Sequence, residues 1–233
     1  MKKIHQIWIT ENNQPPPEYI IKKMEKVKNI YDDYEYKLYN NQSIISLLKA
    51  NFSKNVLLAY SKCNAYAFKA DLVRYCILYL YGGYYFDSAV CPEFKFECDF
   101  NFMPNGGLVI IDEESIKLLD NCFMYFHAPK HHFLKQAIDQ CVENILNHRY
   151  GRHPLDITSP MMLNDLNHFD IKKLDLTIID NRKTIFINER LWLKYKKSIY
   201  SSNLKGLGAQ GTNSYEELWF KKEMFKGIVY PTK

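Results

Sequence analysis

The hydrophobic and polar positions in the first ninety or so residues change between the period of a strand and the period of a helix. In some runs apolar residues alternate with polar ones, whereas in others they recur every three or four positions. The predicted elements, in chain order, are a strand over Ile4–Ile9, a helix over Glu18–Asn29, a strand over Tyr34–Tyr39, a helix over Ser43–Asn51, a helix over roughly Ala65–Tyr81 and a strand over Tyr84–Asp87. This order predicts an α/β protein with a parallel or mostly parallel sheet flanked by helices.

The pattern is weaker after residue 87, where Pro92 and Pro104 interrupt it. The later predicted elements are a strand over Gly107–Ile111, a helix over Phe133–Leu146 and short strands over Leu176–Ile179 and Ile185–Ile187. The segment Ser201–Thr212 is rich in glycine and serine and has no period, which predicts a loop that could serve as a mobile lid. No linker composition divides the chain, so we expect one domain over residues 1–233.

The segment Phe68–Tyr75 places charges in an otherwise apolar helix. Asp71 and Arg74 are three residues apart, so they lie on one face of this helix and each requires a partner. Gly82-Gly83 then ends the helix and turns the chain into the strand that finishes at Asp87. Ligands of open α/β sheets bind at the carboxyl ends of the strands, which makes Asp87 a candidate binding residue. An intrahelical ion pair is the structural alternative for Asp71 and Arg74.

Composition limits the classes to which the protein can belong. Hydrophobic residues make up 47% of the 233 residues and charged residues 24%, which excludes a disordered chain. A net charge of +5 is compatible with an anionic small ligand but is far from that of a nucleic-acid-binding protein. The six cysteines form no metal-binding pattern, and we interpret them as reduced thiols. No apolar run has the length of a signal peptide or a membrane span, so we expect a cytoplasmic protein.

Several blocks of the chain, in order, resemble the DXD-containing sugar transferases of glycosyltransferase family 32. The resemblance extends more distantly to the glucosyltransferase domains of large clostridial toxins. Its specific part runs from Lys69–Tyr75 through Gly82-Gly83 to Asp87. The outer blocks are His5–Trp8, Tyr34–Leu38, Thr158–Pro160 and Asn213–Tyr215, of which the last two are weaker. The resemblance implies a GT-A fold with a Rossmann-like, mostly parallel sheet in a single domain.

The family resemblance implies transfer of a sugar from a nucleotide sugar to a hydroxyl group of a glycan or glycolipid, as in polysaccharide biosynthesis, with retention of the anomeric configuration. A UDP-sugar is the first expectation for the donor and a GDP-sugar the second. Because a glycolipid acceptor lies in a membrane, peripheral contact of the protein with a membrane is compatible with this function. The implied catalytic residues are Asp87, Asp71 and Arg74, and the implied donor-binding residues are these three with Trp8, Ile7, Tyr85, Ser88 and Ser214. The implied cofactor is Mn²⁺ or Mg²⁺, held by Asp87, position 89 and Asn213.

The chain departs from the family motif at its last position. The family has Asp-x-Asp, with the second aspartate as the usual metal ligand, whereas this chain has Asp87-Ser88-Ala89. A methyl group cannot coordinate a cation, so the protein uses another ligand, uses no metal, has lost activity, or carries an engineered substitution. A catalytically silent module that binds a nucleotide sugar or a glycan is therefore the main alternative function. A glycoside hydrolase, which needs two carboxyl groups flanking the bond, is a third.

Other side chains that could take part in binding or catalysis also have purely structural interpretations. His131-His132 could suggest a metal, but a solvated surface or a helix start is the simpler interpretation. His5 is expected to be a hydrogen-bonded strand histidine. The lysines within Lys194–Lys197 could meet a diphosphate, but a solvated basic face is the simpler interpretation. Asp112–Glu114 could hold a base for the acceptor, and a surface turn is the alternative.

Overall fold

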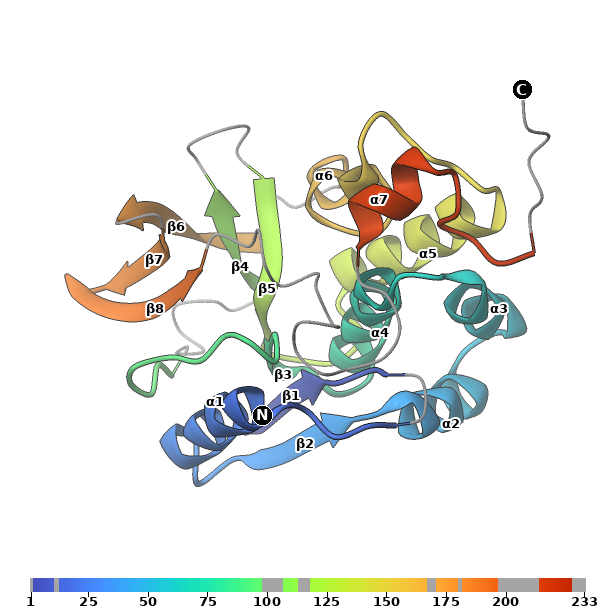
Figure 1. The fold of residues 1–233 in the computed structure, drawn as a ribbon. Coiled ribbons are helices and arrows are strands. Elements are labelled where there is room, and N and C mark those ends of the chain that lie inside the picture. Colours follow the sequence, from blue (N-terminus) through green and yellow to red (C-terminus); the bar gives the residue numbers. More distant parts are fainter. Residues whose placement is uncertain are drawn as a thin grey trace.

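The computed structural model describes residues 2–10, 13–97, 107–112, 118–166, 171–179, 182–196 and 214–227. These segments form an eight-stranded sheet with helices on both faces (Figure 1). The strands, in their order across the sheet, are β2 (Glu35–Tyr39), β1 (Lys3–Ile7), β3 (Gly83–Phe86), β5 (Leu118–Phe126), β4 (Gly107–Asp112), β6 (Ile171–Ile179), β7 (Arg182–Ile187) and β8 (Arg190–Lys196). The predicted α/β class is confirmed.

The strands from which the α/β order was predicted form a parallel part of the sheet. β1 pairs in parallel with both neighbours, so that Ile4 lies opposite Tyr36 of β2 and Tyr84 of β3. β4 and β6 are also parallel. β5 runs antiparallel between β3 and β4, and β6, β7 and β8 follow one another as antiparallel strands. Because β1, β2 and β3 run in one direction, their carboxyl ends meet at one edge, where α/β proteins bind ligands.

Helices cover the two faces of the sheet with separate apolar clusters. The helices are α1 (Glu18–Ile30), α2 (Asn41–Asn51), α3 (Lys54–Lys62), α4 (Tyr66–Tyr81), α5 (His132–Leu146), α6 (Pro160–Asn164) and α7 (Tyr215–Phe220), with a 3-10 helix over Pro154–Asp156. On one face, Val27 of α1 and Tyr31, which directly follows that helix, join Ile4 and Phe86 of the sheet. On the other face, α4 and α5 join β3 and β5 in the larger cluster. Among the described helices, none is both long and apolar enough to cross a bilayer.

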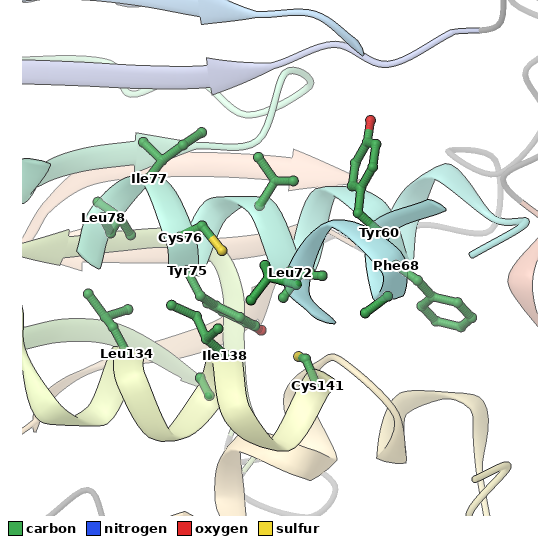
Figure 2. Packing of buried hydrophobic residues seen from close by; sticks show 14 of the residues in the cluster. Tyr60, Phe68, Leu72, Tyr75, Cys76, Ile77, Leu78, Leu134, Ile138 and Cys141 are labelled. Atoms are coloured by element: carbon green, nitrogen blue, oxygen red, sulfur yellow. The ribbon is translucent and has the colours of Figure 1, made fainter. Parts of the chain in front are cut away.

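Helix α4 lies at the centre of the larger cluster. Every residue from Asp71 to Leu78 is buried, because this helix packs against the sheet on one side and α5 on the other. Figure 2 shows Tyr75 and Cys76 of α4 facing Ile138 and Cys141 of α5. A charge in such a helix loses its hydration, so Asp71 and Arg74 must recover that free energy from partners within the protein.

Most predicted helices and strands are confirmed with small shifts of their ends. Helix α2 begins two residues earlier than predicted because the Asn40 side chain caps it, accepting a hydrogen bond of 2.9 Å from Ser43 N–H. The pattern did not predict α3, α6, α7, β5 or β8. β5 is buried along both of its faces from Asn121 to Phe126 and therefore lacks the alternation that marks a half-buried strand. The basic residues Lys194 and Lys196 belong to β8, in which Trp192 is fully buried and Lys194 is half-buried, so the interpretation of this segment as a solvated basic face stays a prediction.

The glycine pair ends α4 and starts β3, as predicted. Gly82 and Gly83 have φ angles of 59° and 87°, which an L side chain rarely adopts. A Cβ atom on Gly83 would lie 2.7 Å from the backbone oxygen of Lys3, so the neighbouring strand also requires glycine there. His5 Nε2 donates to the Gly82 oxygen at 2.9 Å, which confirms the predicted strand histidine, and burial lowers the pKa of His5 to about 4. These contacts set the register of β3 and thereby the place of the residue that follows it.

Candidate active site

Asp87 directly follows β3 at the carboxyl edge of the three parallel strands. Its backbone N–H donates to the Cys122 oxygen at 2.8 Å. Residues 87 to 90 form a turn, which the Val90 N–H closes by donating to the Asp87 oxygen at 2.9 Å. The buried side-chain amide of Gln6 in β1 also donates to that oxygen, at 3.3 Å. Two neighbouring strands therefore hold the backbone of Asp87, so its carboxylate is positioned before any ligand arrives.

Arg74 joins the two carboxylates of the central block. Its Nη2 lies 3.0 Å from Oδ1 of Asp71, and its Nη1 lies 3.1 Å from Oδ1 of Asp87. The same Nη1 donates to the backbone oxygen of Asn121 at 2.6 Å. The guanidinium carbon lies 4.7 Å from the centre of the Tyr85 ring. The intrahelical ion pair is thus present and extends to Asp87, because a planar guanidinium can bond to several acceptors at once.

Asp71 is enclosed in a buried hydrogen-bond network. Its Oδ1 accepts a bond of 2.9 Å from the Asn121 side-chain amide, and its Oδ2 accepts one of 2.8 Å from the Thr158 hydroxyl. The Asn121 amide also donates to the Tyr75 hydroxyl, which in turn donates to the Thr158 oxygen, both at 2.8 Å. Both oxygens of Asp71 have buried donors, so this carboxylate orients Arg74 from inside the protein.

Asp87 is the member of the cluster that faces solvent. Its side chain is 36% exposed, compared with 5% for Arg74 and 7% for Asp71. The Tyr85 hydroxyl donates to Oδ1 of Asp87 at 2.7 Å, so Arg74 and Tyr85 share one oxygen. Among the described residues both contacts go to Oδ1, which leaves Oδ2 available to a ligand. Desolvation raises the pKa of Asp87, and the Arg74 charge and the Tyr85 hydrogen bond oppose that rise.

Burial also raises the pKa of Asp71, from its ordinary 3.8 to about 6. The attraction of Arg74 and the hydrogen bond from Thr158 oppose this rise but do not cancel it. One guanidinium serves two carboxylates, so the ionised cluster has a net negative charge. Such a cluster suits the hydroxyl groups of a sugar better than the oxygens of a phosphate.

We expect an Asp71→Asn variant to differ from the parent in how its stability depends on pH. The pKa of Asp71 is higher in the folded protein than in the unfolded chain, so the parent gains stability as the pH falls through about 6 towards about 4. Asparagine binds no proton there, yet it keeps an oxygen for Arg74. The free energy of unfolding of the parent minus that of the variant should rise by about 1–2 kcal/mol between about pH 7.5 and about pH 5, measured by urea unfolding.

Asp139→Asn is the matched control for the loss of one carboxylate. Asp139 is exposed and lies 2.6 Å from Lys135 on α5. The difference in the free energy of unfolding between the parent and Asp139→Asn should stay constant across the same pH range. A constant difference between the parent and Asp71→Asn would show that burial does not perturb Asp71.

Ser88 and Ala89 are the half-buried central residues of the turn after β3. The Ala89 carbonyl oxygen accepts a hydrogen bond of 2.5 Å from the ammonium group of Lys23 on α1. One turn later on the same helix, Lys26 lies 2.7 Å from the Glu93 carboxylate. Helix α1 therefore places a cation at the turn where the family has its second aspartate.

Ile7 and Trp8 lie at the same edge of the sheet as Asp87. Ile7 ends β1 and is buried, so only its backbone can contact a ligand. The Trp8 indole N–H donates to the Gln14 oxygen at 3.0 Å, which anchors this half-buried ring to the loop before α1. The stacking of Trp8 near a base stays a prediction.

The C-terminal candidate residues are only partly described by the structure. Ser214 precedes α7, whose Tyr215 ring lies 5.8 Å from the ring of Phe68 on α4. Ser214 is therefore near the N-terminal part of the helix that carries Asp71. Asn213, Ser201–Thr212, Lys197 and Glu113-Glu114 lie outside the described residues.

Two members of the buried network were not predicted, and a third was noted only weakly. Thr158 belongs to the weak block Thr158–Pro160, and Tyr75 was assigned to the apolar surface of its helix. Asn121 lies on β5, a strand that the pattern did not predict. A polar pair, Asp120-Asn121, inside an apolar run was the signal that could have identified it.

The described residues at the motif do not fit a divalent-cation site. Mn²⁺ and Mg²⁺ require several oxygen ligands. Asp87 offers one carboxylate whose Oδ1 is already engaged, and Ala89 has no side-chain oxygen. Within the part of the chain that the structure describes, no group of three or more His, Cys, Asp or Glu could hold a metal ion. The donor set at the turn therefore differs from that of the family motif.

Sequence comparison identifies the region that contains this cluster. Residues 17–101 match the family model for the glycosyltransferase sugar-binding region containing the DXD motif. An uncharacterized glycosyltransferase of Acanthamoeba polyphaga mimivirus is 39% identical over 91 residues, which are 39% of this chain and 36% of that protein. Inositol phosphoceramide mannosyltransferase 3 of Schizosaccharomyces pombe is 34% identical over 89 residues, which are 38% of this chain and 24% of that protein. The matched stretch thus spans about a third or less of each relative.

Comparison of structures extends the similarity beyond this region. The solved structure of PaToxG glycosyltransferase superposes with a TM-score of 0.55 and 18% sequence identity, over 70% of this chain and 66% of that one. At this level of identity the similarity concerns the fold. It confirms the predicted GT-A-type α/β architecture.

Proposed function

We propose that the chain transfers a sugar from a nucleotide sugar to a hydroxyl group of a glycan or glycolipid, because residues 17–101 match the family model for the glycosyltransferase sugar-binding region containing the DXD motif. The observation that carries this proposal is the Asp71–Arg74–Asp87 cluster, which lies within the matched region at the carboxyl edge of parallel strands. A UDP-sugar is the first candidate donor and a GDP-sugar the second. In this proposal residues 1–233 act as one domain, and the anomeric configuration is retained. The name of the S. pombe relative, a mannosyltransferase of inositol phosphoceramide, supports a glycolipid acceptor.

In this proposal Asp87 is the residue that meets the donor. Its Oδ2 accepts a hydrogen bond from a ribose or sugar hydroxyl, while Arg74 and Tyr85 hold Oδ1. Arg74 is a positioning residue for Asp87, and the buried Asp71 is a positioning residue for Arg74. At the same edge, Trp8 stacks near the base. Further donor contacts come from the Ile7 backbone, Ser88 and Ser214.

Transfer also requires a cation near the leaving diphosphate. The bond between the anomeric carbon and the diphosphate oxygen breaks with its electron pair on that oxygen, while the acceptor oxygen bonds to the anomeric carbon and its proton passes to the diphosphate. Fixed positive charge must stabilise this leaving group. The Asp71–Arg74–Asp87 cluster has an excess of carboxylates, so it cannot provide that charge. We propose that Lys23, which is held on the Ala89 oxygen, does so.

A nucleotide titration tests the donor site and Lys23 together. We expect the parent to bind UDP more tightly than UMP, and Lys23→Met to bind UDP about 10-fold or more weakly, because a hydrogen bond to a charged group contributes about 1.5–3 kcal/mol. The measurement is isothermal titration calorimetry in EDTA and again in Mn²⁺. Lys26→Met is the matched control, because Lys26 lies one turn away and pairs with Glu93 instead.

The outcomes separate the donor site from the role of Lys23. If the parent binds neither UDP nor GDP in either condition, the proposed donor site is wrong. If Lys23→Met and the parent bind UDP equally, another group neutralises the diphosphate.

A catalytically silent nucleotide-sugar module is the second candidate, and Ala89 is the observation that favours it. Binding of a UDP-sugar without transfer or hydrolysis, in both EDTA and Mn²⁺, would support that function. A glycoside hydrolase is less consistent with the geometry. Asp71 is buried behind Arg74, so Asp71 and Asp87 do not form an open pair of carboxyl groups around a glycosidic bond.

A further inference from the structure

A cationic pocket lies between α2, α3 and the N-terminal part of α4. Its volume is about 600 Å³, which is within the range of small-molecule sites. The described residues that line it are Asn41, Ile45, Lys54, Asn55, Leu57, Leu58, Tyr60, Ser61, Lys69 and Lys226. Three of them carry an ammonium group and none carries a carboxylate.

The three lysines lie at different depths. Lys69 is 92% buried (8% exposed), and its ammonium group lies 5.0 Å from the centre of the Tyr60 ring. Lys54 and Lys226 are exposed and therefore lie at the rim. Positive charge thus runs from the floor of the pocket to its mouth, an arrangement that attracts an anion and strengthens its binding as water is excluded.

The walls of the pocket are held by contacts between distant parts of the chain. The Tyr60 hydroxyl donates to the Asn41 side-chain oxygen at 2.6 Å, which joins α3 to α2. The Lys226 backbone N–H donates to the Lys62 oxygen at 2.7 Å, which joins the segment after α7 to α3. These contacts fix the walls of the pocket without a ligand.

The pocket is separate from the proposed donor site. Lys69 and Asp71 are two residues apart on α4, and residues at that spacing lie on nearly opposite sides of a helix. Asp71 faces Asn121 and Thr158, whereas Lys69 faces Tyr60 of α3. A ligand of the pocket therefore contacts other residues than the donor does.

We infer that this pocket binds the phosphate group of a phosphorylated sugar or polyol. The ammonium groups of Lys54, Lys69 and Lys226 bind the phosphate oxygens. The amide groups of Asn41 and Asn55 provide donors and acceptors for hydroxyl groups, and Leu57 and Tyr60 pack against the C–H faces of the ring. This site goes beyond the proposed donor site and does not rest on it.

Direct binding to the full chain tests the inference. We expect mannose 6-phosphate to bind measurably by calorimetry and mannose not to bind. The double variant Lys54→Glu/Lys226→Glu should weaken the phosphosugar by 10-fold or more, whereas Lys49→Glu should not. Lys49 is exposed on α2 and lies outside the pocket lining, so it controls for the general effect of charge reversal.

Binding to lipid vesicles distinguishes a lipid headgroup from a soluble compound as the source of the phosphate. The phosphate would be assigned to a lipid headgroup if the parent sediments with phosphatidylinositol vesicles but not with phosphatidylcholine vesicles, and if the double variant does not sediment with either. Binding of mannose 6-phosphate alone would assign it to a soluble ligand. UDP binding is measured in the same variants and should not change, which separates this site from the donor site. Equal binding of mannose and its phosphate, or equal affinity in the double variant and the parent, would overturn the inference.

Discussion

An Ala89→Asp variant should hydrolyse or transfer its donor sugar about 100-fold or more faster with Mn²⁺ than with EDTA, whereas the parent should change little. The new carboxylate stands in the turn immediately after Asp87 and adds the oxygen ligands that the motif lacks. A bound metal ion contributes several kcal/mol to stabilising the charge of a leaving group, and each ~1.4 kcal/mol is about tenfold in rate. The measurement is the rate of nucleotide release from several UDP-sugars and GDP-sugars in both conditions.

Two further variants control this experiment. Ala89→Asn has nearly the same shape as Ala89→Asp without the charge, and it should not acquire the dependence on Mn²⁺. Asp87→Ala in the Ala89→Asp background should abolish the Mn²⁺-dependent increase in rate, because the carboxylates at positions 87 and 89 are both needed to bind the metal ion. Equal metal dependence in the parent and Ala89→Asp would show that position 89 is not the missing ligand. Rates in the parent that EDTA does not reduce would support neutralisation by Lys23.

Replacing Arg74 by methionine should lower the free energy of unfolding by about 3–5 kcal/mol, because it leaves the buried carboxylate of Asp71 without its cation. The melting temperature should fall by about 6–20 °C, which differential scanning calorimetry measures. Arg74→Lys should lower the free energy of unfolding by less than Arg74→Met does. It should still weaken donor binding, since an ammonium group cannot bridge Asp71 and Asp87 as the guanidinium does.

The Arg74 prediction has a matched control and a rescue. Arg149 pairs with Glu143 at 2.6 Å where both side chains are about half exposed, so Arg149→Met should cost less than about 1 kcal/mol. Asp71→Asn in the Arg74→Met background should recover part of the loss, because the uncompensated buried charge is removed. Similar losses for Arg74→Met and Arg149→Met, or no recovery in the double variant, would contradict the buried bridge.

The parallel part of the fold was predictable because local patterns determine it. The apolar runs of β1 and β2, the helical periods of α1 and α4, and the glycine pair before β3 are each contained within short segments. The helix end at Gly82 is also predicted locally, whereas the requirement for glycine at Gly83 comes in addition from the close approach of Lys3 on the neighbouring strand.

The elements that close the cluster were not predictable in the same way. β5 is buried on both faces and β8 carries lysines, so neither shows a strand period, and each becomes a strand only through pairing with its neighbours. Asn121 and Thr158 reach Asp71 from 50 and 87 residues away. No local pattern encodes such contacts, because they depend on where the strands and loops pack.

By itself the sequence determined that Asp71 and Arg74 share a helix face, that Asp87 ends a strand, and that position 89 has no ligand atom for a metal, since helical spacing, strand ends and side-chain chemistry are local properties. Only the tertiary structure decided that Asp71 is buried while Asp87 faces solvent, because β5 and Thr158 cover one carboxylate and not the other. It also decided that Lys23, 66 residues before Ala89, lies at the turn. Burial and long-range contacts are sums over the whole packed chain, so spacing along the sequence cannot supply them.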